Sequence, residues 1–149
     1  MSILVDLDLT KYHDQLRFSE SEGHPSIWDP VRKAYFKIAP EEIVRQSWLL
    51  YLHHDYKQSY ASMSVEKQLI VTGLKRRFDL VLYKKSQPFI LFEFKAPEQS
   101  LTSDVGLQVA QYNQVLKVPY IVISNGISSY CFHVDAEKKE VGAVEALPL

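Results

Sequence analysis

The sequence predicts an α/β protein in which helices pack on a mixed β-sheet, and three observations carry that prediction. An amphipathic helical pattern begins at Pro40, three strand-like segments joined by short turns follow it, and a second helical pattern precedes a very apolar fourth strand. Short turns join antiparallel strands, whereas a crossover that contains a helix joins parallel ones. The element order α-β-β-β-α-β-β therefore predicts a sheet with both kinds of pairing.

Three segments precede the first predicted helix. Apolar residues alternate with polar ones over 3–9, which predicts a short edge strand. The very polar stretch 19–26 predicts a loop, and residues 31–38 predict one arm of a hairpin. We assign residues 1–26 to an N-terminal extension of a single domain that spans 1–149.

The first helix is predicted to run from Pro40 to about Asp55 or Tyr56. Proline is tolerated at the first helical position, because the N–H that it lacks would have no partner there. Glu41 and Glu42 follow in the first turn, where negative charge complements the helix dipole. Apolar residues then recur at helical spacing, which predicts one face buried against the sheet.

Five strands and a second helix follow along the chain. Short turns place the first three strands in an antiparallel meander. The crossover through the second helix is right-handed if the strands that it joins are parallel. The predicted segments are strands at 65–71, 77–83 and 88–95, a helix over 104–117, strands at 120–124 and 130–134, and a polar tail over 135–149.

The composition fits one globular domain and excludes several classes of protein. The chain has 149 residues, a formal net charge of −1 and one cysteine, Cys131. One cysteine excludes an internal disulfide and cysteine-rich zinc modules, and the charge excludes nucleic-acid binding by overall positive charge. No apolar run approaches the roughly 20 residues that span a bilayer, and acidic residues stand where a signal peptide needs basic ones. We therefore expect a cytoplasmic protein without a membrane partner.

Acidic residues interrupt two neighbouring apolar strands. Asp79 lies within one strand, and Glu93 and Lys95 lie at the end of the next, where strand alternation places them on the same face. Pairing through the intervening turn brings Asp79 beside Glu93, and two carboxylates about 5 Å apart repel by roughly 3 kcal/mol at an effective dielectric of ~20. A divalent cation removes that cost, and carboxylate oxygens favour Mg²⁺ or Mn²⁺. Lys95 can then orient or deprotonate a water molecule, or hold a phosphate oxygen.

A second pair of polar residues lies on the second predicted helix. Gln108 and Tyr112 are four residues apart and therefore share one helix face, from which both can hydrogen-bond a phosphate or orient the lysine. With Asp79 and Glu93-Phe94-Lys95, this ordered set resembles the PD-(D/E)xK nuclease superfamily. Over residues 27–133 the chain resembles one of its branches, the type I restriction enzyme R-protein N-terminal family. The resemblance lies in the blocks 28–33, 40–46, 77–79, 93–97, 108–113 and 124–126.

The resemblance implies a restriction-endonuclease-like fold and Mg²⁺-dependent cleavage of DNA. Matched to the motif of the family, Asp79 and Glu93 are expected to bind the metal together with the backbone carbonyl of Phe94. Lys95 is then the catalytic lysine. Gln108 and Tyr112 are the supporting pair.

The superfamily often adds an acid from the first helix, and Glu41 and Glu42 both qualify. We favour Glu42, because Glu41 can pair with Arg45 four residues on. Glu66 lies in the first strand of the meander, where a solvated acid is a better interpretation than a site residue. The basic segments 75–77 and 84–85 flank the Asp79 strand and fit a phosphate-binding rim and ordinary solvated turns equally well.

Partners follow from the same resemblance. The chain holds no Gly-rich phosphate-binding loop of the kind that motor ATPases carry, so DNA translocation would need a motor subunit. The predicted partners are DNA, a motor or specificity subunit, and a second copy of the chain. The alternative function is a catalytically silent DNA- or protein-binding module of the same fold.

Overall fold

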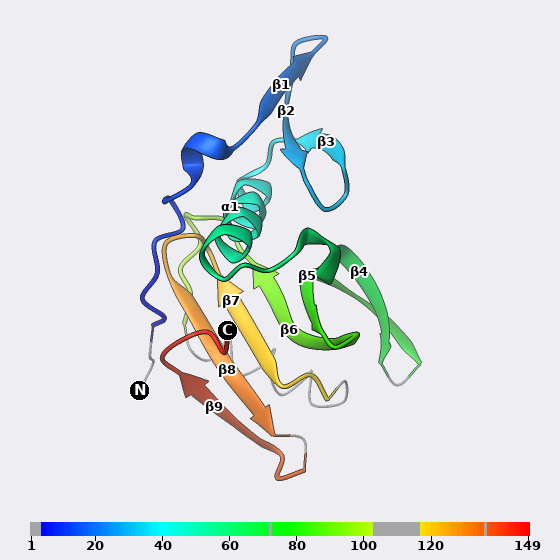
Figure 1. Cartoon of the computed structure of the whole chain (residues 1–149), viewed down its shortest axis with the longest axis vertical. Coiled ribbons are helices and arrows are strands. Elements are labelled where there is room, and N and C mark those ends of the chain that lie inside the picture. The colour runs from blue at the N-terminus through cyan, green and yellow to red at the C-terminus, as the bar shows by residue number, and fades with distance from the viewer. Residues whose placement is uncertain (1–3, 72, 103–116, 136) are drawn as a thin grey trace.

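The computed structural model describes residues 4–71, 73–102, 117–135 and 137–149. Within these residues, one α-helix lies between a small three-stranded sheet and a larger six-stranded one (Figure 1). The small sheet is formed by β1 (Phe18–Ser21), β2 (His24–Asp29) and β3 (Ala34–Lys37). Short 3₁₀ helices stand at His13–Gln15 and Tyr60–Ser62.

The helix α1 (Pro40–Asp55) confirms the first predicted helix at both ends. Ala39 precedes it in an extended conformation, and the proline takes the first helical position. Trp48, Leu49 and Leu52 on its inner face are fully buried against the large sheet. Burial of such side chains stabilises the fold by about 1.5–3 kcal/mol each.

The large sheet confirms the predicted mixed pairing. All its neighbouring strands are antiparallel except β6 and β7, which are parallel. The predicted helix over 104–117 belongs to the connection between those two strands and lies outside the described residues, apart from Lys117. The strand order is the chain order: β4 (Met63–Val71), β5 (Leu74–Lys84), β6 (Gln87–Phe94), β7 (Tyr120–Ser124), β8 (Ser129–Asp135) and β9 (Glu140–Val144).

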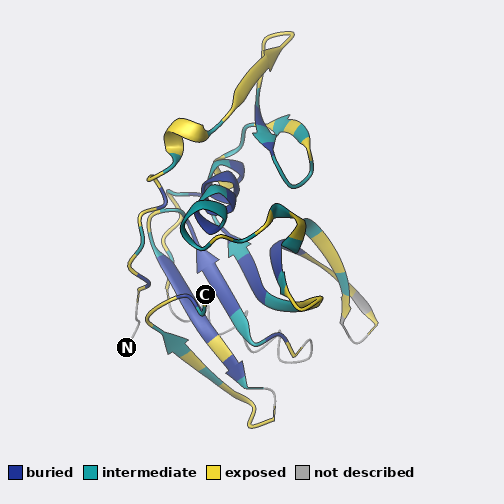
Figure 2. Ribbon diagram, in the orientation of Figure 1, coloured by how far each residue is buried: buried dark blue, intermediate teal, exposed yellow. Residues whose placement is uncertain are grey.

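The two faces of the large sheet carry separate apolar clusters. Alternate residues of β6 show this division, because Ile90 and Phe92 pack toward Trp48 whereas Leu91 joins the cluster on the other face. All three strand residues are buried. Figure 2 shows that much of β6, β7 and β8 is buried. The middle of β6 is therefore a buried strand, and polar residues at its end are exceptions that call for a functional explanation.

Two N-terminal predictions are wrong. Residues 4–9 form no strand; instead, Val5 donates its N–H to the Ser129 carbonyl at 2.9 Å, and Val5 and Leu9 are buried in the core. The predicted loop over 19–26 is a β-hairpin. Its turn residues Glu22 and Gly23 have φ values of 52° and 77°, and positive φ at both central residues is typical of a tight hairpin turn.

The C-terminal segment also departs from the prediction, because it supplies β9 to the edge of the large sheet. This strand pairs antiparallel with β8, and its residues are exposed or half-buried. Leu147 beyond it is buried in the core. Within the described residues, no helix combines the length and the apolar composition needed to cross a membrane.

Candidate active site

The structure brings Asp79 and Glu93 together at one end of the β5–β6 pair. Leu80 lies opposite Phe92, so the next step of the same register places Asp79 opposite Glu93. Burial raises the pKa of both carboxyl groups above their ordinary values. The charge of Asp79 raises the pKa of Glu93 further, as expected for two acids that share a site.

Phe94 and Lys95 complete the end of β6. The N–H of Phe94 donates to Asp79 Oδ2 at 2.7 Å, which places the backbone of this residue beside the carboxylate. The N–H of Lys95 donates to the Ser124 carbonyl on β7 at 2.9 Å. The Lys95 ammonium lowers the pKa of both Asp79 and Glu93, although burial raises them more, so it lies close enough to act on the same charges.

Glu66 joins this group from the neighbouring strand. Val65 lies opposite Leu80 and Lys67 opposite Phe78, which places Glu66 opposite Asp79. Glu66 adopts a φ of 57°, a backbone conformation that non-glycine residues rarely take. Its charge raises the pKa of Asp79 and of Glu93. Glu66 therefore faces the site, the interpretation that the sequence favours less, and its side chain is 32% exposed.

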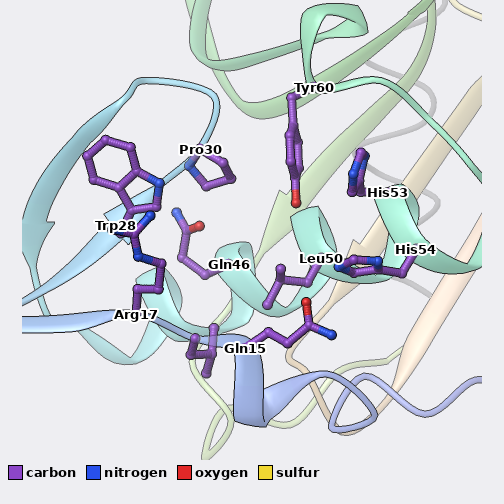
Figure 3. Close-up of a pocket in the computed structure, with 10 residues that line it drawn as sticks. Gln15, Arg17, Trp28, Pro30, Gln46, Leu50, His53, His54 and Tyr60 are labelled. Atoms are coloured by element: carbon purple, nitrogen blue, oxygen red, sulfur yellow. The ribbon is translucent and has the colours of Figure 1, made fainter.

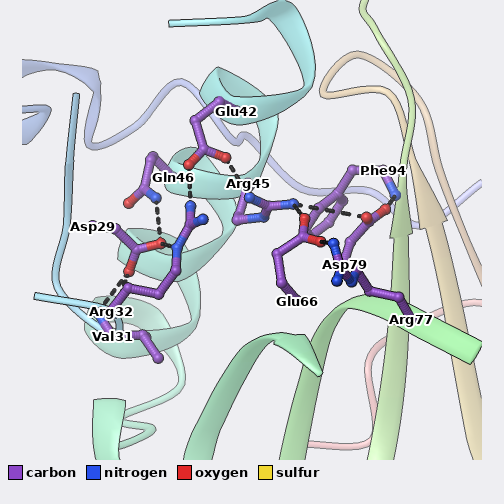
Figure 4. Close-up of polar contacts among 10 residues, drawn as sticks. All are labelled: Asp29, Val31, Arg32, Glu42, Arg45, Gln46, Glu66, Arg77, Asp79 and Phe94. Atoms are coloured by element: carbon purple, nitrogen blue, oxygen red, sulfur yellow. Dashed lines mark hydrogen bonds and ion pairs between the residues drawn. The ribbon is translucent and has the colours of Figure 1, made fainter. Parts of the chain in front are cut away.

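Arg45 of α1 is a buried cation that contacts two of these acids (Figure 4). Its Nη2 forms an ion pair with Glu66 and lies 3.7 Å from Asp79 Oδ1, and its Nη1 pairs with Glu42. Only 8% of the Arg45 side chain is exposed. A buried guanidinium that meets three carboxylates fixes the position of the helix relative to β4 and β5.

The charge network continues from Glu42 away from the sheet. Arg32 donates to Glu42 and, through Nε, to Asp29 Oδ2 at 2.8 Å. Asp29 is fully buried and also accepts from Gln46 Nε2 at 3.0 Å. Alternating acids and bases thus connect the small sheet through α1 to the Asp79 end of the large sheet.

Glu42 therefore faces the site, but through Arg45 and not by direct contact with Asp79. Glu41 is exposed, and the arginine chosen as its partner in the sequence pairs with Glu42 instead. The expected Glu41–Arg45 pair is thus wrong. Gln108 and Tyr112 lie outside the described residues.

Of the two basic segments that fit a phosphate-binding rim, one lies near the carboxylates. Arg77 Nη1 lies 3.7 Å from Glu66 Oε2, and Arg76 lowers the pKa of Glu93. The segment 75–77 thus runs beside the carboxylates, whereas 84–85 lies at the other end of β5. Sequence reasoning considered Arg45 only as a partner for Glu41 and missed its position among the site carboxylates. The one signal for it is a positive charge within the apolar stripe of a helix.

The donor set fits a hard divalent cation. Among the described residues, no group of three Asp, Glu, His or Cys side chains is arranged to hold a metal ion. Mg²⁺, however, is commonly held by one or two carboxylates and several waters. Asp79, Glu93 and the Phe94 carbonyl are oxygen donors of the type that Mg²⁺ prefers, and a cation there would favour the charged forms that burial disfavours.

Comparison with models of known protein families identifies a family that matches most of the chain. The model of the family described as type I restriction enzyme R protein N terminus matches residues 40–148, which includes α1 and every strand of the large sheet. The small sheet precedes the matched region. A search of curated proteins finds no match.

Proposed function

Because the chain belongs to the family of the type I restriction enzyme R protein N terminus, we propose that it is a nuclease domain of the PD-(D/E)xK type that hydrolyses DNA phosphodiester bonds with Mg²⁺ or Mn²⁺. The family suggests a role in restriction. The finer assignment rests on one observation. Two half-buried carboxylates, Asp79 and Glu93, stand at opposing positions with raised pKa values, beside a lysine two residues on.

The proposed chemistry assigns a role to each residue of the candidate site. Asp79, Glu93 and the Phe94 carbonyl hold the metal ion, which when bound supplies charge stabilisation at the phosphate. The Lys95 ammonium orients the attacking water or holds a phosphate oxygen. Gln108 and Tyr112 are proposed to support the lysine, and Glu42 to hold Arg45 in place.

The family also indicates what the domain works with. An R protein is one subunit of a restriction enzyme, so we propose DNA and other subunits, including a motor or specificity subunit, as partners. The cytoplasmic location and a second copy of the chain stay predictions.

The direct test is DNA cleavage by the purified chain. Supercoiled, linear and single-stranded DNA are incubated with Mg²⁺ or Mn²⁺, and with EDTA as the metal-free control. Lys95→Ala is expected to lose cleavage by at least about 100-fold, in the range of a general acid–base group. Lys138→Ala, an exposed lysine in the β8–β9 turn, is the matched control and should cut like the wild type.

Metal binding separates the two functions that the site supports. Arg45 already balances Asp79 and Glu66 without a metal, an observation that favours the alternative of a catalytically silent binding module. Calorimetric titration with Mn²⁺ decides between them. Binding that Glu93→Gln abolishes supports the nuclease site, whereas neither metal binding nor cleavage, together with metal-independent DNA binding, supports the silent module.

A further inference from the structure

One face of the small sheet carries a row of basic and aromatic side chains. Trp28 lies opposite Tyr35, and their ring centroids are 5.2 Å apart. Arg17 precedes β1 and places its guanidinium 5.1 Å from the centroid of the Trp28 ring. Lys37 lies two residues beyond Tyr35 and therefore on the same face. We name Arg17, Trp28, Tyr35 and Lys37 the basic aromatic face.

Strand alternation keeps acidic residues off this face. The pairs Ser19–Ser26, Ser21–His24 and Ser26–Lys37 share it, so its other members are neutral or basic. The acids of the three strands, Glu20 and Asp29, take the alternate positions on the opposite face. A sheet face without a carboxylate is electrostatically suited to a polyanion, although the net charge of the chain is −1.

The face is open and hollowed at both ends. Tyr35 is 42% exposed, and Arg17 and Lys37 are exposed as well. A hollow of about 430 Å³ lies at Tyr35 and Lys37, within the range of roughly 300–1,000 Å³ for small-ligand sites. A second hollow, of about 250 Å³, lies at Arg17 and Trp28 (Figure 3).

That second hollow extends from the small sheet to α1. Figure 3 shows Trp28 and Arg17 on one wall, and His53 with Tyr60 on the other. The rings of His53 and Tyr60 stack at 4.1 Å. Both ends of the row therefore open into hollows whose linings include aromatic rings and a guanidinium or ammonium group, and such groups contact bases and phosphates.

We propose that the basic aromatic face binds a single-stranded segment of DNA. Bases stack on Tyr35 and on the Arg17–Trp28 pair, while the cationic ends of Arg17 and Lys37 contact phosphates. That the ligand is DNA rests on the proposed function. The inference adds that the DNA bound at this face is single-stranded. The face lies outside residues 40–148, the region that matches the family.

Single-stranded DNA is favoured over duplex for a geometric reason. In a duplex the flat faces of the bases are covered by their neighbours, so exposed rings on a protein find no partner there. In a single strand every base offers a π-face, and stacking on an aromatic side chain contributes without regard to sequence. The Trp28 and Tyr35 rings are tilted by 60°, so one base stacks on one ring while its edge meets the other.

The test measures binding of a fluorescent oligothymidine to the full chain in EDTA, where hydrolysis cannot proceed. Tyr35→Ala is expected to lose at least about fivefold in affinity, and Tyr35→Phe to keep it, because stacking needs the ring and not the hydroxyl. Phe18→Ala is the matched control: Phe18 is 55% exposed on the opposite face of the same sheet.

The contribution of the charged side chains to binding is measured by its dependence on salt. Lys37→Ala should weaken binding and lower the slope of log affinity against log salt by roughly 0.7, the value for one phosphate contact to a single strand. Lys138→Ala, an exposed lysine in the turn between β8 and β9, should leave both the affinity and the slope unchanged. Circular dichroism confirms that each variant is folded.

Three results would overturn the proposal: no binding of the oligothymidine, equal loss in Phe18→Ala and Tyr35→Ala, or a duplex bound as tightly as the single strand. Binding that depends on Tyr35 in a chain that cuts no DNA would support this face and reject only the nuclease. Cleavage of single strands at unchanged KM in Tyr35→Ala would reject this face and leave the nuclease standing.

Discussion

Replacing Glu93 by glutamine should stabilise the protein at neutral pH. One step beyond the Leu80–Phe92 pair, the register places Asp79 opposite Glu93, and Cβ atoms of opposing residues in an antiparallel pair lie about 4.5–5.5 Å apart. Two full charges at that separation repel by about 3 kcal/mol at an effective dielectric of ~20. Lys95 and Arg76 oppose part of this repulsion. We expect a net gain of about 1 kcal/mol in the free energy of unfolding.

The pH dependence gives this prediction its sign. The pKa of Glu93 is raised in the folded protein above its ordinary value of 4.5, first by burial and then by Asp79. Between pH 4.5 and the raised pKa, Glu93 is protonated more in the folded state than in the unfolded state. The free energy of unfolding therefore falls as the pH rises through that range. The glutamine amide of the Glu93→Gln protein does not titrate. The advantage of this variant should therefore appear above about pH 4.5 and vanish below it.

Urea denaturation at about pH 7.5 and about pH 4 measures both effects, with Mg²⁺ absent. Glu137→Gln is the control, because Glu137 is exposed in the β8–β9 turn and should change stability by less than about 0.5 kcal/mol. A Glu93→Gln protein that is less stable at neutral pH, and equally stable at low pH, would refute the reasoning. The carboxylate would then contribute more by its contacts than it costs by repulsion.

Added metal should reverse the order of the two proteins. At about tenfold over its dissociation constant, a ligand that binds only the folded state adds about 1.4 kcal/mol. Wild type should gain that amount with Mg²⁺, while Glu93→Gln should gain little because a ligand is missing. Equal gains in the two proteins would place the metal away from Glu93.

Three further predictions concern residues that stabilise the fold or lie buried within it. Arg45→Met should lower the free energy of unfolding by about 1.5–3 kcal/mol in urea, because it removes the charge-assisted hydrogen bonds that Arg45 donates to Glu42 and Glu66, while Arg32 still pairs with Glu42 and Arg77 still lies near Glu66; a loss under about 1 kcal/mol would contradict this. Gly126→Ala should destabilise more than Gly23→Ala in thermal melts, since both glycines have positive φ but only at Gly126 would an added Cβ lie 3.2 Å from Val44; equal losses would show that φ alone decides. Cys131, whose pKa burial raises to about 12, should react with a thiol reagent only as the protein unfolds; rapid labelling of the native state would contradict its burial.

Local rules were sufficient for much of the fold. The start of α1 follows from a proline and two acids in one turn, and the β5–β6 turn at 85–86 follows from a short polar break between two apolar strands. Only part of the small sheet could be found this way: the hairpin arm predicted over 31–38 contains β3, which pairs antiparallel with β2, but β1 was not predicted. Its β1 residues are all exposed, so no apolar alternation marks them, and its turn places a glutamate, Glu22, at positive φ.

The candidate site shows the same difference between contacts that local sequence predicts and contacts that depend on how distant elements pack. Strand periodicity places Asp79 beside Glu93, because both belong to one hairpin with a short turn. Arg45 and Glu66 are 21 residues apart, and their ion pair depends on how α1 crosses β4. Spacing alone favours Glu41 as the partner of Arg45. The structure instead turns Arg45 inward, where burial selects Glu42.

The position of Arg45 determines what a metal can change. Its Nη2 lies 3.7 Å from Asp79, beyond hydrogen-bond distance, whereas Asp79 is held at 2.7 Å by the Phe94 N–H. A cation bound at Asp79 and Glu93 would therefore displace no hydrogen bond of Arg45. The ion pairs of Arg45 with Glu42 and Glu66 do not involve Glu93, so we expect them to persist when a metal binds. Arg45 thus neutralises Glu42 and Glu66 more directly than it does Asp79 and Glu93. Asp79 and Glu93 are the two carboxylates that the proposed chemistry needs to bind a metal.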